Sequence, residues 1–562
     1  MAAPTPHDTD DWWRDAVIYQ VYPRSFTDGD GDGTGDLAGV RARLPYLADL
    51  GVDAVWFTPW YLSPLVDGGY DVADYRTVDP AFGTLAEAEK LIAEARALGI
   101  RTIVDIVPNH VSDQHPWFRA ALAAGPGSQE RELFHFRPGR GPDGARPPND
   151  WPSQFSGATW TRVPDGEWYL HLFSPEQPDL NWAHPAVRRE HEDILRFWFE
   201  RGVAGVRIDS AALLTKDPAL PDFVEGADPH PYIDRDDLHD VYRSWRAVAD
   251  EYGGVFVGEV WLPDAERFAR YLRPDELHTA FNFTFLTCPW EAGRLRRAID
   301  GTLAEHAPVG APATWVLCNH DVTRTVTRYG RADTGFDFAA KRFGTPAAPE
   351  LGTRRARAAA LLTLALPGSV YVYQGEELGL PEADIPLDRI QDPMHFRSRG
   401  TDPGQRRLPG APAVGGGGAV VRLRRRGRAV AAAARHLGVV RGRPAERRPG
   451  VDAHALPSGP AAAPVRGRLR GRSVDLAPRP AGRARLRAPA RAAVRRQPLR
   501  RACRSAPARA AAPGQRTTGR RGAAAPGHGG VAARMSPAVE EGGERAVRVR
   551  NSLAWLALIM HA

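Results

Sequence analysis

The sequence predicts an α/β fold, a (β/α)8 TIM barrel with a subdomain inserted after its third strand. Three observations support this prediction. Eight short runs rich in β-branched or aromatic residues lie between positions 16 and 373. Amphipathic helical stretches separate most of these runs, and the interval after the third run is too long for a plain loop. An open doubly wound sheet is the alternative, and the count of eight strands favours the barrel.

The predicted elements can be named in chain order. The strands are Ala16–Tyr22, Ala54–Thr58, Thr102–Val107, Gly205–Asp209, Val255–Glu259, Ala280–Phe283, Thr314–Cys318 and Ser369–Tyr373. The helices are Leu85–Leu98, Pro185–Arg201, Leu238–Tyr252 and Thr353–Leu364. A barrel of this kind brings the carboxyl ends of all its strands to one face, where its active site is found.

Composition divides the chain into four segments. Residues 1–110 and 180–404 are the two parts of the predicted barrel, and residues 111–179, rich in Pro, Gly and Trp, are the predicted insert, subdomain B. Residues 405–562 are a tail rich in Arg, Ala, Gly and Pro, with 34 basic and 6 acidic side chains against 40 and 61 in residues 1–404. Trp555 is the one aromatic residue of the tail, so only the first 404 residues can build a large apolar core.

Targeting and redox signals favour a cytoplasmic protein without a membrane partner. Met1–Trp13 is acidic and lacks the basic and then apolar pattern of a secretory signal. The apolar run Leu553–Met560 is too short to span a bilayer. The cysteines, Cys288, Cys318 and Cys503, lack the paired spacing of metal ligands, which favours a reducing compartment.

Acidic side chains follow three of the predicted strands. Arg207 and Asp209 end the fourth strand, Glu259 ends the fifth, and His320 and Asp321 follow the seventh. The pleat of a strand points Arg207 and Asp209 to the same side, so the cation can keep the acid ionised. Taken singly, such residues are more often helix caps or turns. Three carboxylates together at the ends of barrel strands indicate glycoside hydrolysis, with a nucleophile, an acid/base and an orienting group.

Five ordered motifs resemble the α-amylase family, glycoside hydrolase family 13, and most closely its α-glucosidase and oligo-1,6-glucosidase branch. They are Asp105–His110, Gln177–Trp182, Gly205–Asp209, Gly258–Trp261 and Asn319–Asp321, and the resemblance extends from about Val17 to Gly404. It implies that Asp209 attacks the anomeric carbon, that Glu259 protonates the leaving oxygen and then activates water, and that Asp321 stabilises the transition state. Retention of configuration follows, with the Asp209 and Glu259 carboxyls about 5 Å apart.

The resemblance also implies the residues that bind the sugar at the cleaved end, and no cofactor for the chemistry. These residues are Tyr70 as the aromatic platform, Asp71 as the hydroxyl-binding acid, His110, Arg207 and His320 against the sugar, and Phe173 and Gln177 as further pocket lining.

The segment from Asp28 to Asp36 is a candidate metal site. Asp28, Asp30, Asp32, the Thr34 carbonyl and Asp36 could wrap a hard cation, and intervening glycines permit the tight path. No Glu stands at position 12, so the match to an EF-hand loop is partial, and a solvated acidic turn is an equal alternative on the residues alone. The resemblance implies a structural Ca²⁺, because related α-glucosidases bind Ca²⁺ in this loop.

We therefore expect a retaining α-glucosidase that hydrolyses α-1,4-linked gluco-oligosaccharides of the maltose type from the non-reducing end. Family members with Val after the nucleophile tend to cleave α-1,6 links and those with a smaller residue α-1,4 links, and here Ser210 follows Asp209. The alternatives are an α-1,6-glucosidase or transglycosylase of sucrose or trehalose type and, from another class, a non-catalytic barrel that binds a partner.

Three origins compete for the tail: an Arg-rich arm that binds nucleic acid, a natural low-complexity extension, and out-of-frame translation of a GC-rich gene. The third is favoured. In place of Gln405–Val414 the family has a segment like R-D-G-C-R-x-P-x-P-W, and removing one base from a permitted codon spelling restores R-D-G-C-R-V-P-L-P-W. We therefore expect no nucleic-acid partner. We also expect the family's eighth barrel helix and C-terminal β-sandwich to be missing, which would expose apolar surface and weaken activity.

Overall fold

The computed structural model describes residues 11–337, 345–383 and 390–398. Its main feature is an eight-stranded parallel sheet with the strand order β11-β10-β9-β5-β2-β1-β13-β12. The strands are β1 (Val17–Val21), β2 (Ala54–Phe57), β5 (Arg101–Ile106), β9 (Gly205–Ile208), β10 (Val255–Gly258), β11 (Thr279–Ala280), β12 (Thr314–Val316) and β13 (Ser369–Tyr373). All eight predicted strands are present.

Contacts between the first and last strands of this order close the sheet. The Asn282 N–H, just after β11, donates to the Thr314 carbonyl of β12 at 3.0 Å. The hydroxyls of Thr279 and Thr314 are hydrogen-bonded as well. The fold is therefore the predicted (β/α)8 barrel, and the alternative of an open doubly wound sheet is wrong.

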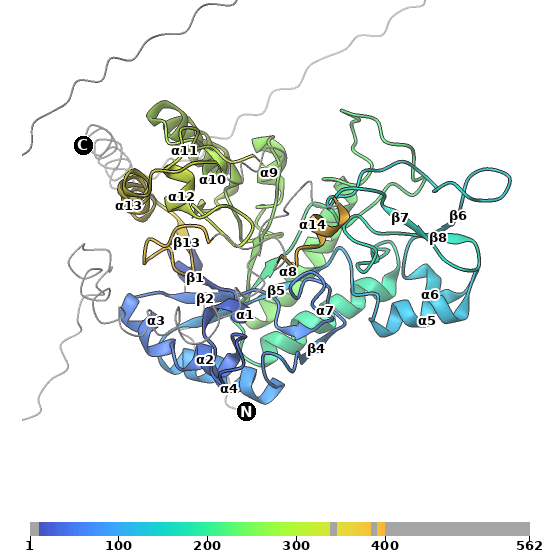
Figure 1. Cartoon of the computed structure of the whole chain (residues 1–562), viewed down its shortest axis with the longest axis horizontal. Helices are drawn as coiled ribbons and strands as arrows, with labels where there is room; N and C mark the ends of the chain where they lie inside the picture. The colour runs from blue at the N-terminus through green and yellow to red at the C-terminus, as the bar shows by residue number, and fades with distance from the viewer. Residues whose placement is uncertain (1–10, 338–344, 384–389, 399–562) are drawn as a thin grey trace, which may run out of the picture. The chain divides into compact units, whose positions relative to one another are not determined.

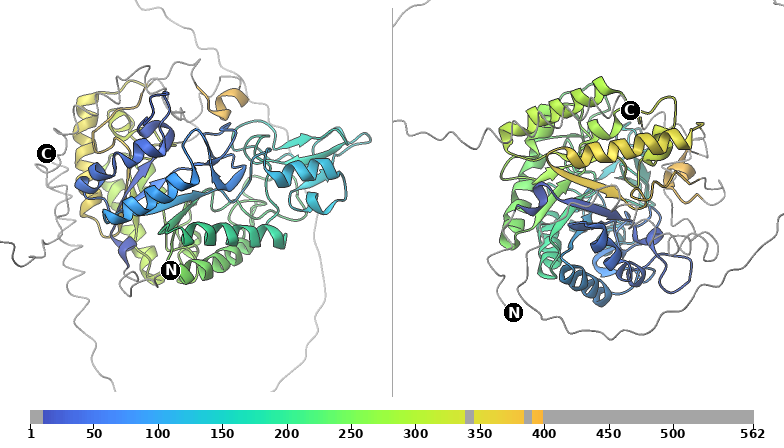
Figure 2. Two further views of the ribbon diagram at one scale, coloured as in Figure 1. Left: turned by 90° about the horizontal axis from the view of Figure 1, so that it is seen from below. Right: turned by 90° about the vertical axis from the view of Figure 1, so that its left-hand side faces the viewer.

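Side chains alternate between the inside of the barrel and the helices around it. Ile18, Trp56, Ile103 and Tyr371 belong to one core cluster, which fills the inside of the barrel. Their strand neighbours pack outward under the helices, which surround the strands in both views of Figure 2. The helices of this outer layer include α3 (Leu44–Leu50), α4 (Leu85–Ala97), α7 (Pro185–Glu200), α8 (His239–Tyr252), α11 (Ala292–His306) and α13 (Pro349–Ala365).

Helix ends follow local signals in the sequence. Helix α4 begins with a capping box, in which the Thr84 hydroxyl accepts from the Glu87 N–H and the Glu87 carboxylate accepts from the Thr84 N–H. Helix α13 begins at Pro349, four residues before the predicted start, because Pro is well suited to the first turn. Helix α11 was not predicted.

The sixth predicted strand, Ala280–Phe283, is shorter than expected. Strand β11 ends at Ala280, and helix α10 (Phe283–Thr287) begins three residues later. The Asn282 side chain accepts a 2.9 Å bond from the Phe285 N–H and so caps that helix. The cap turns the chain out of the sheet.

The interval between β5 and α7 folds as two helices and a separate antiparallel sheet. Helices α5 (Pro116–Ala124) and α6 (Gln129–Glu132) accompany the sheet β6-β8-β7, formed by β6 (Phe136–Pro138), β7 (Trp160–Arg162) and β8 (Glu167–Leu170). Figure 1 shows these elements clustered together, away from α11, α12 and α13. A buried ion pair of 2.9 Å between Lys216, which follows β9, and Asp179 joins this insert to the barrel.

The remaining elements are short. They are η1 (Trp12–Arg14), α1 (Pro23–Phe26), α2 (Leu37–Arg41), β3 (Tyr61–Leu62), β4 (Asp74–Val78), η2 (Asp236–Leu238), α9 (Ala265–Arg270), η3 (Ala307–Val309), α12 (Thr325–Tyr329) and α14 (Pro393–Arg397). Among the described residues, no helix has both the length and the apolar character needed to cross a membrane. The predicted tail, residues 405–562, lies outside the described residues, as do the expectations attached to it.

Candidate active site

The guanidinium of Arg207, on β9, lies among three carboxylates, one directly after its own strand and two from the neighbouring strands β5 and β10. Its Nη1 donates to both oxygens of Asp105 on β5, at 2.9 and 3.1 Å, and to Asp209 Oδ1 at 2.7 Å. Its Nη2 donates to Glu259, which follows β10. The register of the strands brings these groups together, since Asp105 on β5 and Val257 on β10 are the strand partners of Arg207. Because the Arg207 side chain is only 1% exposed, this pairing is what makes so many buried charges tolerable.

Glu259 is held at both carboxylate oxygens. The Trp261 indole N–H donates to Oε1 at 2.9 Å, and the Ser210 N–H donates to Oε2 at 3.1 Å. Burial raises the pKa of Glu259 to about 7, an effect that Arg207 opposes and the negative charge of Asp209 reinforces. Near neutral pH this carboxyl can therefore carry a proton, which a general acid needs.

A chain of hydrogen bonds leads from strand β1 to Asp105 through His320 and Tyr70. The Gln20 amide nitrogen lies 2.8 Å from Nδ1 of His320, and Nε2 of the same ring lies 2.8 Å from the Tyr70 hydroxyl. That hydroxyl donates to Asp105 at 3.1 Å, and the two rings are nearly parallel, 7° apart. Asp321 Oδ1 lies 3.5 Å from His320 Nε2, so the third predicted acid lies beside the same ring.

A second group of predicted residues gathers around His110. Its Nε2 lies 3.0 Å from the Gln177 amide nitrogen, which also donates to Asp67 at 2.9 Å. Phe173, half-buried, lies with its ring 4.9 Å from the His110 ring. Burial lowers the pKa of His110, so the ring is neutral and can donate or accept a single hydrogen bond at each nitrogen.

Asp71 is placed differently from the other predicted sugar-binding residues. Its two carboxylate oxygens accept from the backbone N–H groups of Val66 and Asp67, at 2.9 and 3.0 Å, and the side chain is fully buried. These bonds fix the loop around Tyr70, whereas Asp67 is the acid of this loop that contacts Gln177. Spacing alone does not distinguish the two acids, because both lie within three residues of Tyr70.

Two further site residues were outside the predicted set. Asp105 is the first residue of the first family motif, and it is paired with Arg207 in the register of the parallel strands β5 and β9. Its position could therefore have been inferred from the strand assignments. Trp261 follows Glu259 by two residues, yet its bond to the carboxylate depends on a loop conformation that strand patterns do not specify.

The acidic loop Asp28–Asp36 brings three of its five predicted ligands together. Carboxylate oxygens of Asp28, Asp30 and Asp36 lie within 4.8 Å of one another. Gly31 and Gly33 have φ of +91° and +99°, a left-handed path that glycine adopts without strain. Three hard oxygen donors at this spacing fit Ca²⁺, and the Asp32 carboxylate is not part of the cluster.

Comparison with known proteins decides the family. The sequence profile of the family Alpha-amylase, described as "Alpha amylase, catalytic domain", matches residues 20–409. The chain belongs to the α-amylase family. The resemblance found in the five motifs is therefore confirmed.

Curated relatives and solved structures within the α-amylase family carry several activities in their names. The trehalose-6-phosphate hydrolase of Escherichia coli K12 is 41% identical over 383 residues, which span 66% of this chain and 66% of that protein. The oligo-1,6-glucosidase of Heyndrickxia coagulans is 36% identical, over 68% of this chain and 69% of that protein. The alpha-glucosyl transfer enzyme XgtA superposes with a TM-score of 0.64 at 33% identity, over 76% of this chain and 84% of that one.

A further α-amylase-family neighbour contains a bound sugar. An isomaltulose synthase mutant of Erwinia rhapontici NX5 in complex with D-glucose superposes with a TM-score of 0.62 at 32% identity, over 71% of this chain and 70% of that one. The chain thus spans about two thirds of the length of these curated relatives. The names of the relatives and solved structures refer to different activities.

Proposed function

We propose that the chain is a retaining α-glucosidase that hydrolyses α-1,4-linked gluco-oligosaccharides from the non-reducing end. The observation that carries this proposal is the shared guanidinium: Asp209 and Glu259 accept from Nη1 and Nη2 of Arg207. Two acids bound to one planar fork lie close together, which supports the separation of about 5 to 5.5 Å in retaining enzymes over the wider gap of inverting ones.

The three acids divide the reaction by their surroundings. Asp209, paired with Arg207, attacks the anomeric carbon while Glu259 gives its proton to the leaving oxygen. Glu259, now ionised, then takes a proton from the water that releases the sugar from Asp209. Asp321 binds sugar hydroxyls and stabilises the positive charge of the transition state.

The sugar at the cleaved end is bound by side chains from both the barrel and the insert. Tyr70 and His320 present nearly parallel rings beside the acids, and His110 with Gln177 offers polar atoms to hydroxyl groups. Gln177 and Phe173 belong to the insert, so we assign residues 111–179 as subdomain B, which completes a pocket between barrel parts 1–110 and 180–404. A pocket closed on one side favours cleavage of single units from a chain end.

The proposal also specifies which glucosidic linkage is cleaved, α-1,4 rather than α-1,6. Ser210, next to the nucleophile, supports α-1,4 cleavage by the family tendency described above. Its φ of +44° disfavours a β-branched residue at this position. A second candidate, an α-1,6-acting or transglycosylating enzyme, is supported by relatives named oligo-1,6-glucosidase and isomaltulose synthase.

The proposal includes a structural Ca²⁺ ion and a reducing compartment for the protein. Asp28, Asp30 and Asp36 would hold the ion and fix the turn before α2, and it would take no part in the chemistry. Cys288 and Cys318 are buried free thiols, which agrees with a cytoplasmic location.

Asp209→Asn tests the function. We expect hydrolysis of p-nitrophenyl α-glucoside to fall on the order of 10⁴-fold or more, with an unchanged melting temperature, because the nucleophile is lost and the shape is kept. Proton NMR of the first product should show the α-anomer from the unsubstituted chain. Initial release of the β-anomer would contradict retention, and undiminished activity in Asp209→Asn would support the non-catalytic alternative.

Ser210→Val tests the linkage. Rates on maltose and isomaltose should favour maltose in the unsubstituted chain, and the ratio should move toward isomaltose in the variant. A preference for isomaltose before substitution would favour the second candidate.

We also propose that the tail arises from a frame error near codon 405. Sequencing of the gene across this codon should reveal one extra base. An error-free gene would contradict this origin. Vigorous maltose hydrolysis by the purified 562-residue chain would contradict the expectation that the tail weakens activity.

A further inference from the structure

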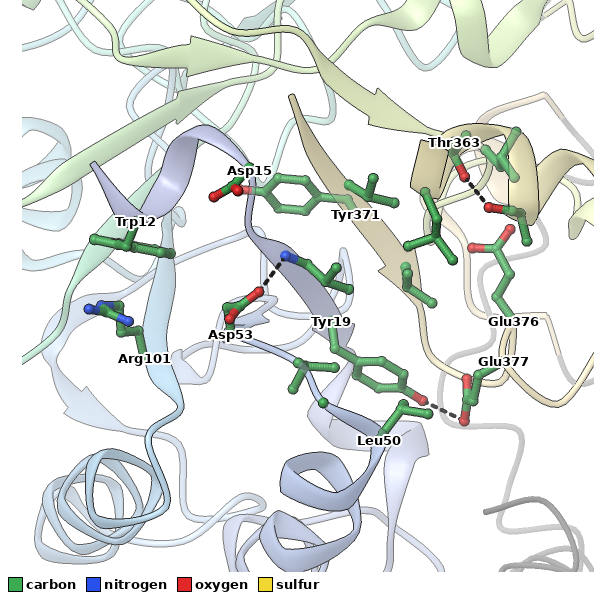
Figure 3. A pocket seen from close by; sticks show the side chains of 18 residues that line it. Trp12, Asp15, Tyr19, Leu50, Asp53, Arg101, Thr363, Tyr371, Glu376 and Glu377 are labelled. Atoms are coloured by element: carbon green, nitrogen blue, oxygen red, sulfur yellow. Dashed lines mark hydrogen bonds between the residues drawn. The ribbon is translucent and has the colours of Figure 1, made fainter. Parts of the chain in front are cut away.

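Lys216 is the one buried lysine among the described residues. Its side chain and that of its partner Asp179 are both 0% exposed, and burying two charges costs free energy that neutral groups do not cost. Neutral donors hold another acid of this molecule. Glu377, in the cavity of Figure 3, accepts 3.0 Å bonds from the hydroxyls of Tyr19, drawn there, and Tyr46. An acid can thus be held without a lysine, so the cation beside Asp179 indicates a further role.

Three oxygen atoms surround the ammonium group of Lys216. Its Nζ donates to Asn109 Oδ1 at 2.7 Å and to the Leu213 carbonyl at 2.8 Å. Asp179 Oδ2 lies 2.9 Å from the same Nζ. An ammonium group has three N–H donors and no acceptor, so the atom of Asn109 that faces it is the amide oxygen.

This contact fixes the orientation of the Asn109 amide. With Oδ1 at Lys216, the Nδ2 group lies 3.1 Å from Asp179 Oδ1 and 3.1 Å from His110 Nδ1. A flipped amide would place its nitrogen against the ammonium and its oxygen against the carboxylate, so both of these contacts would be lost. Nδ2 therefore donates to His110 Nδ1.

The Asn109 amide decides which nitrogen of His110 carries the proton. Because Nδ1 accepts from Asn109, the proton is on Nε2, and this N–H donates to the Tyr70 carbonyl at 3.2 Å. The opposite tautomer would lose both bonds and would gain a single one, from the Gln177 amide at 3.0 Å. Two hydrogen bonds outweigh one, so the Nε2–H tautomer is favoured.

Gln177 presents a donor to His110 as well. Its Oε1 accepts from the Ser174 N–H at 3.2 Å, and its Nε2 donates to Asp67 at 2.9 Å. The 3.0 Å contact between Nε2 of Gln177 and Nε2 of His110 therefore brings two donors together. A sugar hydroxyl has lone pairs that can accept from such donors, so this side of the pocket favours an acceptor.

We propose that Lys216 is a positioning residue that fixes the Nε2–H tautomer of His110 through Asn109, and so makes His110 a hydrogen-bond donor to the sugar at the cleaved end. The donor role rests on the proposed α-glucosidase function, whereas the tautomer is a property of the free chain. Burial lowers the pKa of His110 and the charge of Lys216 adds to this effect, so the ring is neutral and has one proton to place.

Nitrogen NMR of the free 562-residue chain tests the tautomer. With isotope-labelled histidine, correlations to the ring hydrogens distinguish a protonated ring nitrogen from a bare one. The signals of His110 are those that disappear in His110→Gln. We expect a bare Nδ1 and a protonated Nε2. A protonated Nδ1 would overturn the proposal, and this measurement requires neither activity nor a change at Lys216.

A matched pair of variants isolates the effect of Lys216. Asp179→Asn removes the acid and keeps the lysine, whereas the double variant Lys216→Met with Asp179→Asn removes both, so neither leaves an unpaired buried carboxylate. The Nδ1 signal of His110 should stay at the bare position in Asp179→Asn. It should move toward the protonated position in the double variant, because the released Asn109 amide can flip. The same Nδ1 signal in both variants would overturn the role of Lys216.

Lys90 provides a control for the loss of a lysine. It is exposed on α4, so Lys90→Met should leave the signals of His110 unchanged. A shift as large as that of the double variant would show that the signal reports net charge, and it would overturn the proposed path through Asn109.

Kinetics test the link between the tautomer and the sugar. Relative to Asp179→Asn, the double variant should raise KM for maltose about tenfold and leave kcat within about twofold, because a contact equal in the ground and transition states is lost. An equal KM with a moved Nδ1 signal would overturn the donor role of His110. If the unsubstituted chain hydrolyses no α-glucoside, the proposed function fails, and the NMR measurement still decides the tautomer.

Discussion

Two groups of carboxylates in this molecule are held in opposite ways. Asp105, Asp209 and Glu259 accept from the guanidinium of Arg207. Asp71, like Asp28 of the acidic loop, accepts from backbone N–H groups. Backbone donors fix the path of a loop, whereas one shared cation sets the charge of several acids at once. The same residue type therefore serves chemistry or scaffolding according to its partner.

Replacing the shared cation should have the largest effect. Arg207→Lys keeps the charge but loses the planar fork that reaches Asp209 and Glu259 together. We expect kcat/KM on p-nitrophenyl α-glucoside to fall on the order of 10³-fold, because the acids lose their alignment. Breaking the buried network should also lower the free energy of unfolding by about 3 to 5 kcal/mol, measured by urea denaturation. Near-normal activity would show that the acids are held by other contacts.

The two acids around Tyr70 offer a matched pair. Asp67→Asn should raise KM for maltose about tenfold, since Asp67 contacts Gln177 in the pocket, and should leave stability nearly unchanged. Asp71→Asn should lower the free energy of unfolding by about 1 to 3 kcal/mol, because one backbone N–H loses its acceptor. Steady-state kinetics and urea denaturation distinguish the two outcomes. The reverse pattern would return Asp71 to the sugar-binding role implied by the family resemblance.

Trp261→Phe should change the pH dependence of the reaction. The indole N–H favours the ionised form of Glu259, so its removal should raise the pKa of this carboxyl above its value of about 7. The acid form is the active one in the first step, so activity is lost as pH rises through this pKa. The basic limb of kcat/KM against pH should therefore move upward by about one unit.

A tryptophan far from the acids serves as the control for this shift. Trp168→Phe removes an indole N–H that donates to the Gly144 carbonyl in the insert, and it should leave the pH profile unchanged. A downward shift or no shift in Trp261→Phe would show that the indole does not favour the ionised carboxylate.

The acidic loop should show the smallest effect. If Ca²⁺ binds the folded chain only, saturation at 100 times the dissociation constant adds about 2.7 kcal/mol of stability. Asp30→Asn, which removes one charge from an exposed member of the cluster, should reduce the rise in melting temperature on calcium addition and leave kcat unchanged. A melting temperature insensitive to calcium and to chelator would leave the loop as a solvated acidic turn.

Particular elements explain how far the sequence could predict this molecule. The eight strands were predictable because each is a short apolar run, and Asp209 and Glu259 were predictable because they end two of them. The sixth strand was overestimated, since the run continues through Phe283 while the cap at Asn282 redirects the chain. The cap residue is a signal that sequence patterns do contain.

The loop from Ser63 to Tyr70 could not be predicted in the same way. Its turns use positive φ at Leu65, Gly68 and Gly69, and these turns direct Asp67 to Gln177. Gln177 is 110 positions away in the chain, so no local pattern contains this contact. The bond between Trp261 and Glu259 joins residues only two positions apart, but it depends on a loop conformation that strand patterns do not specify.

The sequence by itself determined the barrel, the order of its strands along the chain and the acids at the strand ends, because side-chain periodicity and the strand-end rule are local properties. The tertiary structure decided which acids share Arg207 and which acid of the Tyr70 loop contacts Gln177. Those properties depend on side chains from distant segments meeting in a water-poor interior, where the partner of each carboxylate fixes its charge.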